Sequence, residues 1–352
     1  MRGRGDRLAA ELAELELELM LVTDLVNVRY LTGFTGTNGA CICGSDIRCF
    51  LTDFRYTERA AAEVEGWEPV TVAGDWLGGI AAHLSGRFGF EDDHASVRLL
   101  ERLRGKLAEG VEPVAAGGAV EKLRRVKDEG ELAAIAAASE LADQVWGWSL
   151  ERGLGGRSER DVARAAEARI RELGGDPSFP AIVAAGPNGA LPHAEPGERR
   201  IGSGELVVFD MGAMLDGYCS DGTRTFAVGD PGEHAQDVYE TVRAAQAAAL
   251  DAVAAGVGGK ELDGVAREVI SAAGFGDRFG HGLGHGVGLE VHEEPRLSTL
   301  SEDTLEAGAV VTIEPGVYLP GDLGVRIEDL IVVTEGGCRN LSGLPKELQM
   351  VE

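Results

Sequence analysis

The stretch that decides the fold runs from Leu206 to Val228, LVVFDMGAMLDGYCSDGTRTFAV. Two apolar runs flank Asp216-Gly217, a residue pair favoured in the two-residue turn of a β-hairpin. The turn also fixes the register of the predicted hairpin, because strands joined by a tight turn have little freedom to slip. Counted outward from the turn, the predicted cross-strand pairs are Leu215 with Tyr218, Asp221 with Gly212, and Asp210 with Thr223.

This register makes Asp210 and Asp221 diagonal neighbours with side chains on one face of the hairpin. Two carboxylates held that close repel each other unless one is protonated or a cation lies between them. The pattern therefore indicates an acid pair or a metal site. An ordinary hairpin with both aspartates on a solvated face is an equally open interpretation, since diagonal like charges can turn away into water.

A second acidic pair lies in Val310–Val333, VVTIEPGVYLPGDLGVRIEDLIVV, where two strand-like runs flank a turn-forming stretch. Glu314 and Glu328 each interrupt an apolar run, and a buried carboxylate needs a partner because burying it alone is costly. For Glu328, Arg326 on the same strand face offers an ion pair without any metal. That explanation does not extend to Glu314.

Histidines cluster in Phe279–Arg296, FGHGLGHGVGLEVHEEPR. His281 and His285 have the four-residue spacing of a helical zinc pair, but glycine at nearly every second position argues against a helix. Such glycines indicate backbone packed closely against another strand or a substrate. A histidine is more often a hydrogen-bonded structural residue than a ligand, so we expect one metal ligand in this stretch.

Segments spread over nearly the whole chain resemble the metal-dependent Xaa-Pro peptidases, prolidase and aminopeptidase P, of the creatinase or pita-bread fold. They are NVRYLTGFTGTNG from Asn27, FLTDFRYTERA from Phe50, LRRVKDEGEL from Leu123, AGPNGALPHAEP from Ala185, VFDMGAMLDGYCSDGTRTF from Val208, GHGLGHGVGLEVHEEPR from Gly280, VVTIEPGVY from Val310 and GVRIED from Gly324. The resemblance implies an α/β (α+β) fold, with a smaller N-terminal creatinase-type α/β domain and a C-terminal pita-bread catalytic domain.

The resemblance also implies a role for particular residues, carried over position by position. The metal ligands it implies are Asp210, Asp221, His285, Glu314 and Glu328, with Asp221 and Glu328 bridging two ions. The catalytic residues it implies are His193, His292 and Glu314, and the substrate-binding residues are His281, Arg296, Tyr318 and Arg326. For Arg296, a surface arginine after a proline turn is an equally open interpretation.

Four oxygen donors and one imidazole suit a hard or borderline divalent ion. Manganese or cobalt is the expected metal for both positions, and zinc or iron(II) is also compatible, because selection in a cell depends on availability as well as affinity. Two such ions would make a water molecule nucleophilic near neutral pH. Glu314 is the expected acceptor of the water's proton, with His292 or His193 beside the developing oxyanion.

Two activities fit the enzyme class. Prolidase cleaves Xaa-Pro dipeptides, whereas aminopeptidase P removes the first residue of longer Xaa-Pro peptides. The short N-terminal domain and the ending Pro345–Leu348, PKEL, favour prolidase. A non-catalytic peptide- or protein-binding member of the same fold is a distant alternative. The presence of all five ligand positions argues against it, and against metal-free creatinase-like hydrolysis.

Composition excludes several partners. The 352-residue chain is 44% hydrophobic and 26% charged, which is ordinary for a globular protein long enough for two domains. Its net charge of −26 argues against nucleic acid and anionic membranes as partners. Five cysteines do not suggest a disulfide framework, and glutamates interrupt the leucines near the N-terminus, unlike a signal sequence or membrane span. We expect a cytoplasmic enzyme, and the resemblance implies a homodimer.

The distribution of proline and glycine predicts two domains, 1–118 and 119–352, joined near the linker Pro113–Gly118. A long helix rich in alanine is expected over residues 121–150, and further helices over 158–173, 236–255 and 259–273.

Overall fold

The structure, a computed structural model, describes residues 2–352. The chain divides into two compact units, Met1–Arg124 and Arg125–Glu352. Both combine helices with sheets, so the mixed α/β class expected from the sequence is confirmed. The first unit extends past the expected linker, because α6 (Ala119–Arg124) packs on α1 (Arg2–Glu14) and α2 (Leu25–Thr32).

A six-stranded sheet in the order β4-β3-β2-β1-β5-β6 forms the centre of the first unit. β1 is parallel to β5, and β5 to β6, whereas β2 is antiparallel to both of its neighbours. The strands are β1 (Leu19–Val22), β2 (Gly39–Gly44), β3 (Arg48–Thr52), β4 (Glu68–Thr71), β5 (Arg87–Phe90) and β6 (Glu112–Ala115).

Alternate side chains of each strand point to opposite faces of this sheet. Buried residues lie on both faces, and helices cover both. Leu21 and Ile42 lie in a core cluster with residues of α4 and α5. Cys43, on the other face, donates to the carbonyl of Gly5 in α1 (3.4 Å). The remaining helices are η1 (Phe54–Tyr56), α3 (Thr57–Glu63), α4 (Trp76–Ala81) and α5 (Val97–Arg104).

The second unit contains four long helices and four sheets, in the orders β11-β10-β7, β20-β12-β9-β8, β14-β13-β15-β18-β19 and β16-β17. Its helices are α7 (Glu129–Glu151), α8 (Glu159–Glu172), η2 (Gly186–Ala190), α9 (Gly232–Ala252), α10 (Gly259–Ala272) and η3 (Gly276–Arg278). Its strands are β7 (Asp176–Pro177), β8 (Ile182–Ala185), β9 (Glu205–Asp210), β10 (Ala213–Leu215), β11 (Tyr218–Cys219), β12 (Thr223–Val228), β13 (Gly284–Gly286), β14 (Glu293–Leu297), β15 (Val310–Ile313), β16 (Gly316–Leu319), β17 (Leu323–Arg326), β18 (Asp329–Thr334), β19 (Gly337–Asn340) and β20 (Met350–Val351).

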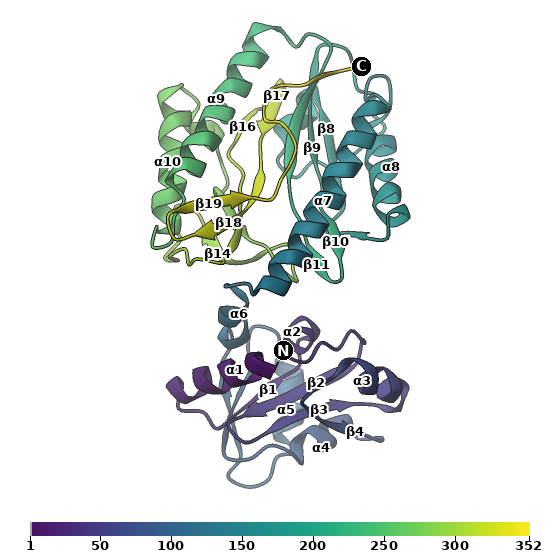
Figure 1. The fold of residues 1–352 in the computed structure, drawn as a ribbon, viewed down its shortest axis with the longest axis vertical. Coiled ribbons are helices and arrows are strands. Elements are labelled where there is room, and N and C mark those ends of the chain that lie inside the picture. Colours follow the sequence, from purple (N-terminus) through teal and green to yellow (C-terminus); the bar gives the residue numbers. More distant parts are fainter. Residues whose placement is uncertain (1) are drawn as a thin grey trace. The chain divides into compact units, whose positions relative to one another are not determined.

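Two helix pairs enclose the strands of this unit (Figure 1). α7 and α8 pack against β8, β9 and β12 through one hydrophobic cluster, which includes Trp146, Ile170 and Phe209. α9 and α10 pack against β15, β17 and β18 through another, which includes Val242 and Ile313. The strands that lie between the helix pairs carry the candidate site residues.

The predicted register of the first hairpin is confirmed. Leu215 pairs with Tyr218, and Asp210 pairs with Thr223. Between these rungs the register continues, because the N–H of Met211 donates to the Gly222 carbonyl at 3.1 Å. At the turn, Asp216 and Gly217 have φ values of 48° and 78°, as a turn with two left-handed residues requires.

The single helix expected over residues 121–150 is wrong, because the chain forms two helices there, α6 and α7. The side chain of Asp128 accepts the N–H of Glu131 (2.9 Å), and the side chain of Glu131 accepts the N–H of Asp128 (3.0 Å). This capping box starts a new helix at Glu129 by satisfying its first amide groups. The expected helices over 158–173, 236–255 and 259–273 correspond to α8, α9 and α10.

Within residues 2–352, no helix combines the length and the apolar character needed to cross a membrane. Disulfides do not link the five cysteines.

Candidate metal centre and active site

The five candidate metal ligands line one cavity of about 490 Å³ in the second unit. Each lies at or beside a strand end, where the backbone is held by pairing and the side chain faces the cavity. They are Asp210 at the end of β9, Asp221 before β12, His285 within β13, Glu314 after β15 and Glu328 before β18.

Strand pairing explains why residues so far apart in the sequence converge. β15 and β18 pair Ile313 with Asp329, so Glu314 and Glu328 lie opposite each other one residue beyond this rung. The N–H of Glu328 donates to the carbonyl of Thr223 (3.0 Å), and the hydroxyl of Thr223 donates to Glu328 Oε2 (2.7 Å). Thr223 therefore joins the two predicted carboxylate pairs.

Three of the five candidate ligands have potential ligand atoms close enough together to hold one ion. One potential ligand atom from each of Asp221, His285 and Glu328 lies within 4.8 Å of the others. His285 Nε2 is 3.5 Å from Asp221 Oδ2 and 3.4 Å from Glu314 Oε1. Asp210 Oδ1 is buried without a hydrogen-bond partner among the described residues.

The orientation of the His285 ring suits metal binding. Its Nδ1 is 3.0 Å from the carbonyl of Gly286, to which it donates as N–H. In the neutral ring this leaves the Nε2 lone pair directed at the carboxylates. Burial lowers the pKa of His285 to about 3, which favours that neutral form.

Without a cation, the carboxylates destabilise one another's charged forms. Burial, followed by the neighbouring carboxylates, raises the pKa values of Asp221 and Glu328 well above their usual range. Burial also raises the pKa of Asp210, and that of Glu314 to about 8. Hard divalent cations prefer such oxygen-rich, negatively charged sites, so these residues fit a divalent metal.

Arg326 does not provide the metal-free ion pair that its spacing predicts for Glu328. Its Nη2 donates instead to Asp210 Oδ2 (2.5 Å), and its Nε to Thr223 Oγ1 (3.0 Å). The reason is that β17 ends at Arg326 and β18 begins at Asp329, so Arg326 and Glu328 do not share one regular strand face. Glu328 thus keeps its carboxylate facing the cavity.

Tyr318 lies behind the cavity wall and links two other candidates. Its hydroxyl accepts from Arg326 Nη1 (2.9 Å) and lies 2.9 Å from His281 Nε2. The other ring nitrogen of His281 is 2.8 Å from the Gly282 carbonyl. Burial lowers the pKa of His281 to about 4, so this ring is neutral and hydrogen-bonded on both sides.

The remaining candidates are exposed residues that line the cavity: His193, His292 and Arg296. The His292 ring packs edge-on against the ring of His285, with centroids 4.4 Å apart. All predicted site residues except Tyr318 therefore line one cavity.

Sequence reasoning missed Thr223 beside the cavity and the apolar part of the cavity wall. Thr223 was identified only as the pair of Asp210, although that register already placed it beside the carboxylates. Phe179 and Ile182 form an apolar part of the cavity wall. Their short apolar stretch at the start of β8 carries no signal that distinguishes it from core.

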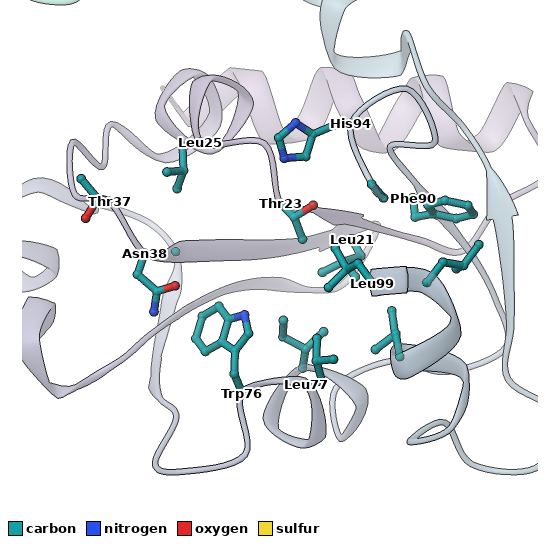
Figure 2. Close-up of a pocket in the computed structure, with 15 residues that line it drawn as sticks. Leu21, Thr23, Leu25, Thr37, Asn38, Trp76, Leu77, Phe90, His94 and Leu99 are labelled. Carbon is teal, nitrogen blue, oxygen red and sulfur yellow. The ribbon is translucent and has the colours of Figure 1, made fainter. Parts of the chain in front are cut away.

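A second cavity, of about 230 Å³, lies in the first unit (Figure 2). Its walls are mainly apolar side chains such as Leu21, Leu77 and Phe90, with Trp76 and His94 also facing it. Among the described residues that line it, none is a carboxylate or a cysteine, and His94 is its one imidazole, so its donor set is much poorer than that of the cavity in the second unit. The candidate metal ligands all line the cavity of the second unit.

A carboxylate cluster with one imidazole, set among the strands of a pita-bread unit, defines a metal-dependent hydrolase. Residues 133–335 match the metallopeptidase family M24, and residues 4–126 match the creatinase/prolidase N-terminal domain. The chain belongs to metallopeptidase family M24 and is an enzyme of that class.

Solved structures agree with this assignment. An Xaa-Pro dipeptidase from Bacillus anthracis is 37% identical, with a TM-score of 0.97 and 99% of each chain covered. A prolidase from Pyrococcus furiosus is 36% identical, with a TM-score of 0.89, covering 95% of this chain and 98% of its own. An X-Pro aminopeptidase from Thermotoga maritima is 33% identical, with a TM-score of 0.92, covering 99% of this chain and all of its own, 100%.

Proposed function

We propose that this protein is an Xaa-Pro dipeptidase, a prolidase, that hydrolyses the bond before proline with two divalent metal ions. The observation that carries the proposal is the convergence of four carboxylates and the Nε2 atom of one histidine on a single cavity. The likeness to the dipeptidase of Bacillus anthracis, over 99% of both chains, supports the dipeptide as substrate.

Two ions would be held by Asp210, Asp221, His285, Glu314 and Glu328, and Asp221 and Glu328 would be shared between them. Manganese or cobalt is favoured by the oxygen-rich donor set, and zinc or iron(II) is compatible with it. When bound, such ions lower the pKa of water and polarise the scissile carbonyl.

The chain's own residues are proposed to manage the protons. Glu314 accepts a proton from the attacking water and passes it to the proline nitrogen, which leaves poorly unless it is protonated. His292 and His193, exposed along the cavity, are proposed to donate to the developing oxyanion.

Arg296 is proposed to bind the substrate carboxylate, because its exposed guanidinium lines the cavity. Arg326, which lines the cavity and holds Asp210 at 2.5 Å, is proposed to contribute to substrate binding. Tyr318 is proposed to support it from behind the cavity wall by holding His281. Phe179 and Ile182 offer apolar contact to the proline ring, which has no N–H to satisfy.

The proposed setting is the cytoplasm, with a homodimer as the active form. Five free cysteines support a reducing compartment. The homodimer rests on the family resemblance alone.

Aminopeptidase P activity is the second candidate, because the X-Pro aminopeptidase from Thermotoga maritima covers 99% of this chain with a TM-score of 0.92. Metal-stripped protein should be assayed on Ala-Pro and Ala-Pro-Ala, with and without added Mn²⁺. We expect Mn²⁺-dependent cleavage of Ala-Pro alone. Release of alanine from Ala-Pro-Ala would establish the aminopeptidase instead, and inactivity on both with several metals would remove both proposals.

A further inference from the structure

A second charged cluster lies directly behind the candidate ligands. Arg224 and Asp329 form an ion pair at 2.6 Å, and their exposed fractions are 2% and 0%. Neither residue lines the cavity, and neither takes part in the reaction proposed above. A buried ion pair seldom adds net stability. We therefore ask which parts of the chain this pair holds in place.

Arg224 uses all of its hydrogen-bonding capacity on three segments of the second unit. A guanidinium has five N–H groups, and each of these has an acceptor here. The acceptors are the carbonyls of Thr223 (3.0 Å from Nη1), Glu328 (2.5 Å from Nη1), Leu344 (2.9 Å from Nη2) and Pro345 (3.1 Å from Nε), and the carboxylate of Asp329 (2.6 Å from Nη2).

Few backbone hydrogen bonds join the two strands that Arg224 connects, β12 and β18. β12 and β18 belong to different sheets, and within residues 2–352 their backbone pairing is a single isolated β-bridge, Thr223 with Glu328. At that bridge the Glu328 carboxyl group shares one cavity with those of Asp221 and Glu314, and carboxylates so close together repel one another when charged. Arg224 donates from Nη1 to both carbonyls of the bridge, so its guanidinium holds the two strands together against this repulsion.

The last residues of the chain complete the cluster; we call residues 341–352 the C-terminal strap. Lys346 Nζ donates to Asp329 Oδ2 (2.8 Å), and Asn340 Nδ2 donates to the same oxygen (2.7 Å). Further along the strap, β20 pairs with β12 at Ala227 and Met350. The strap therefore contacts both strands that meet at the bridge, and none of its described residues lines the cavity.

We propose that Arg224 is a positioning residue for the metal centre, and that Asp329 and the C-terminal strap fix Arg224 in turn. By holding Thr223 against Glu328, Arg224 keeps the Glu328 carboxylate beside Asp210 and Asp221 in the geometry that binds metal. The inference rests on the metal site of the proposed function.

The test compares Arg224→Lys with Arg199→Lys, a matched control. Lysine keeps the positive charge beside Asp329 but cannot reach five acceptors at once. Arg199 pairs with Glu205 in the same unit, and neither residue lines the cavity. Mn²⁺ binding to metal-stripped protein is measured by calorimetry, and Tm is measured with and without Mn²⁺.

For Arg224→Lys we expect about 10-fold or greater loss of Mn²⁺ affinity, the usual range for an outer partner of a ligand, and a smaller rise in Tm on adding Mn²⁺. For Arg199→Lys the Mn²⁺ affinity and the rise in Tm should equal those of the wild type. A purely structural role would lower Tm equally with and without Mn²⁺ and leave the Mn²⁺ affinity unchanged, which would overturn the proposal.

If Arg224→Lys does not fold, Lys346→Met decides, because it removes one strap contact and leaves Asp329 its bonds to Arg224 and Asn340. We expect a smaller loss of Mn²⁺ affinity in the same direction, and an unchanged affinity would overturn the proposal. Wild-type protein that binds none of Mn²⁺, Co²⁺, Zn²⁺ and Fe²⁺ would instead remove the proposed function. Mn²⁺-binding wild type with unaltered variants would remove only this inference.

Discussion

Single atoms set what the cavity can bind. The Gly286 carbonyl occupies Nδ1 of His285, so Nε2 is the ring nitrogen left to face Asp221 and Glu314. Arg326 holds one oxygen of Asp210 and leaves the other, Oδ1, buried with no partner among the described residues. These contacts fix the orientation of both side chains before any ion arrives, which is how a protein lowers the cost of binding a metal.

At this scale we predict the effect of Asp221→Asn. The substitution removes a proposed bridging carboxylate, so kcat/KM for Ala-Pro with Mn²⁺ should fall by more than about 100-fold, the upper range for loss of a mere outer partner. The fold should persist, since the amide relieves repulsion with Asp210 and Glu314. Steady-state kinetics and the Tm of the metal-free protein check both statements. Activity equal to that of the wild type would exclude the two-metal mechanism.

Among the elements, local signals predicted the structure where the chain pairs with its near neighbours. The register predicted from the Asp216-Gly217 turn placed Asp210, Asp221 and Thr223 correctly, because a tight turn allows a single register. Long-range pairing left no comparable signal. The bridge between Thr223 and Glu328 joins residues of different hairpins, and Arg326 turned toward Asp210 because its strand ends there.

The helix prediction over 121–150 shows the opposite limit. Alanine-rich composition favours helix throughout that range, but Asp128 and Glu131 satisfy each other's backbone groups and begin a separate helix. The residues of that capping box were visible in the sequence. Val126, between the two helices, forms a β-bridge with Ala309, and no local pattern in the sequence indicated this long-range pairing.

The element that carries His285 supplies a second prediction, Gly284→Ala. A Cβ on Gly284 would lie 2.0 Å from the carbonyl oxygen of Thr312 in β15, so β13 must move away. We expect a loss of at least about 1–3 kcal/mol in the free energy of unfolding, and weaker Mn²⁺ binding because His285 moves with the strand. Chemical denaturation and calorimetry measure these quantities.

Gly264→Ala is the matched control for this substitution. Its added Cβ meets nothing within 4 Å, and Gly264 lies inside helix α10. Alanine should therefore stabilise the protein by about 0.5–1 kcal/mol without changing Mn²⁺ affinity. Equal stability changes in the two variants would contradict the close packing inferred for β13 and β15.

At the scale of the whole molecule, the cavity and every residue that lines it belong to the unit Arg125–Glu352. The stability of this unit must depend on what neutralises its buried carboxylates. Burial raises the pKa of Glu314 to about 8, and those of Asp221 and Glu328 well above their ordinary values. Near neutral pH, these carboxyl groups therefore keep protons in the folded, metal-free protein that they have released in the unfolded chain.

From this we predict the pH dependence of the metal-free protein. A carboxyl group whose pKa is raised by folding contributes stability below its ordinary pKa, and that contribution is lost as pH rises through the folded value. Between about pH 7 and 9, an interval that spans the raised pKa of Glu314, the buried histidines are already neutral, since their pKa values are lowered. The Tm of metal-free protein should therefore fall across this interval. Differential scanning calorimetry with saturating Mn²⁺ should give a much flatter profile, and a flat profile without metal would contradict the prediction.

The raised carboxyl pKa values also bear on how the enzyme matures. With these carboxyl groups protonated, the metal-free site carries less negative charge, so the chain should complete its fold before it meets a metal ion. Binding of cations should then release protons, so the affinity of the site for metal should rise with pH.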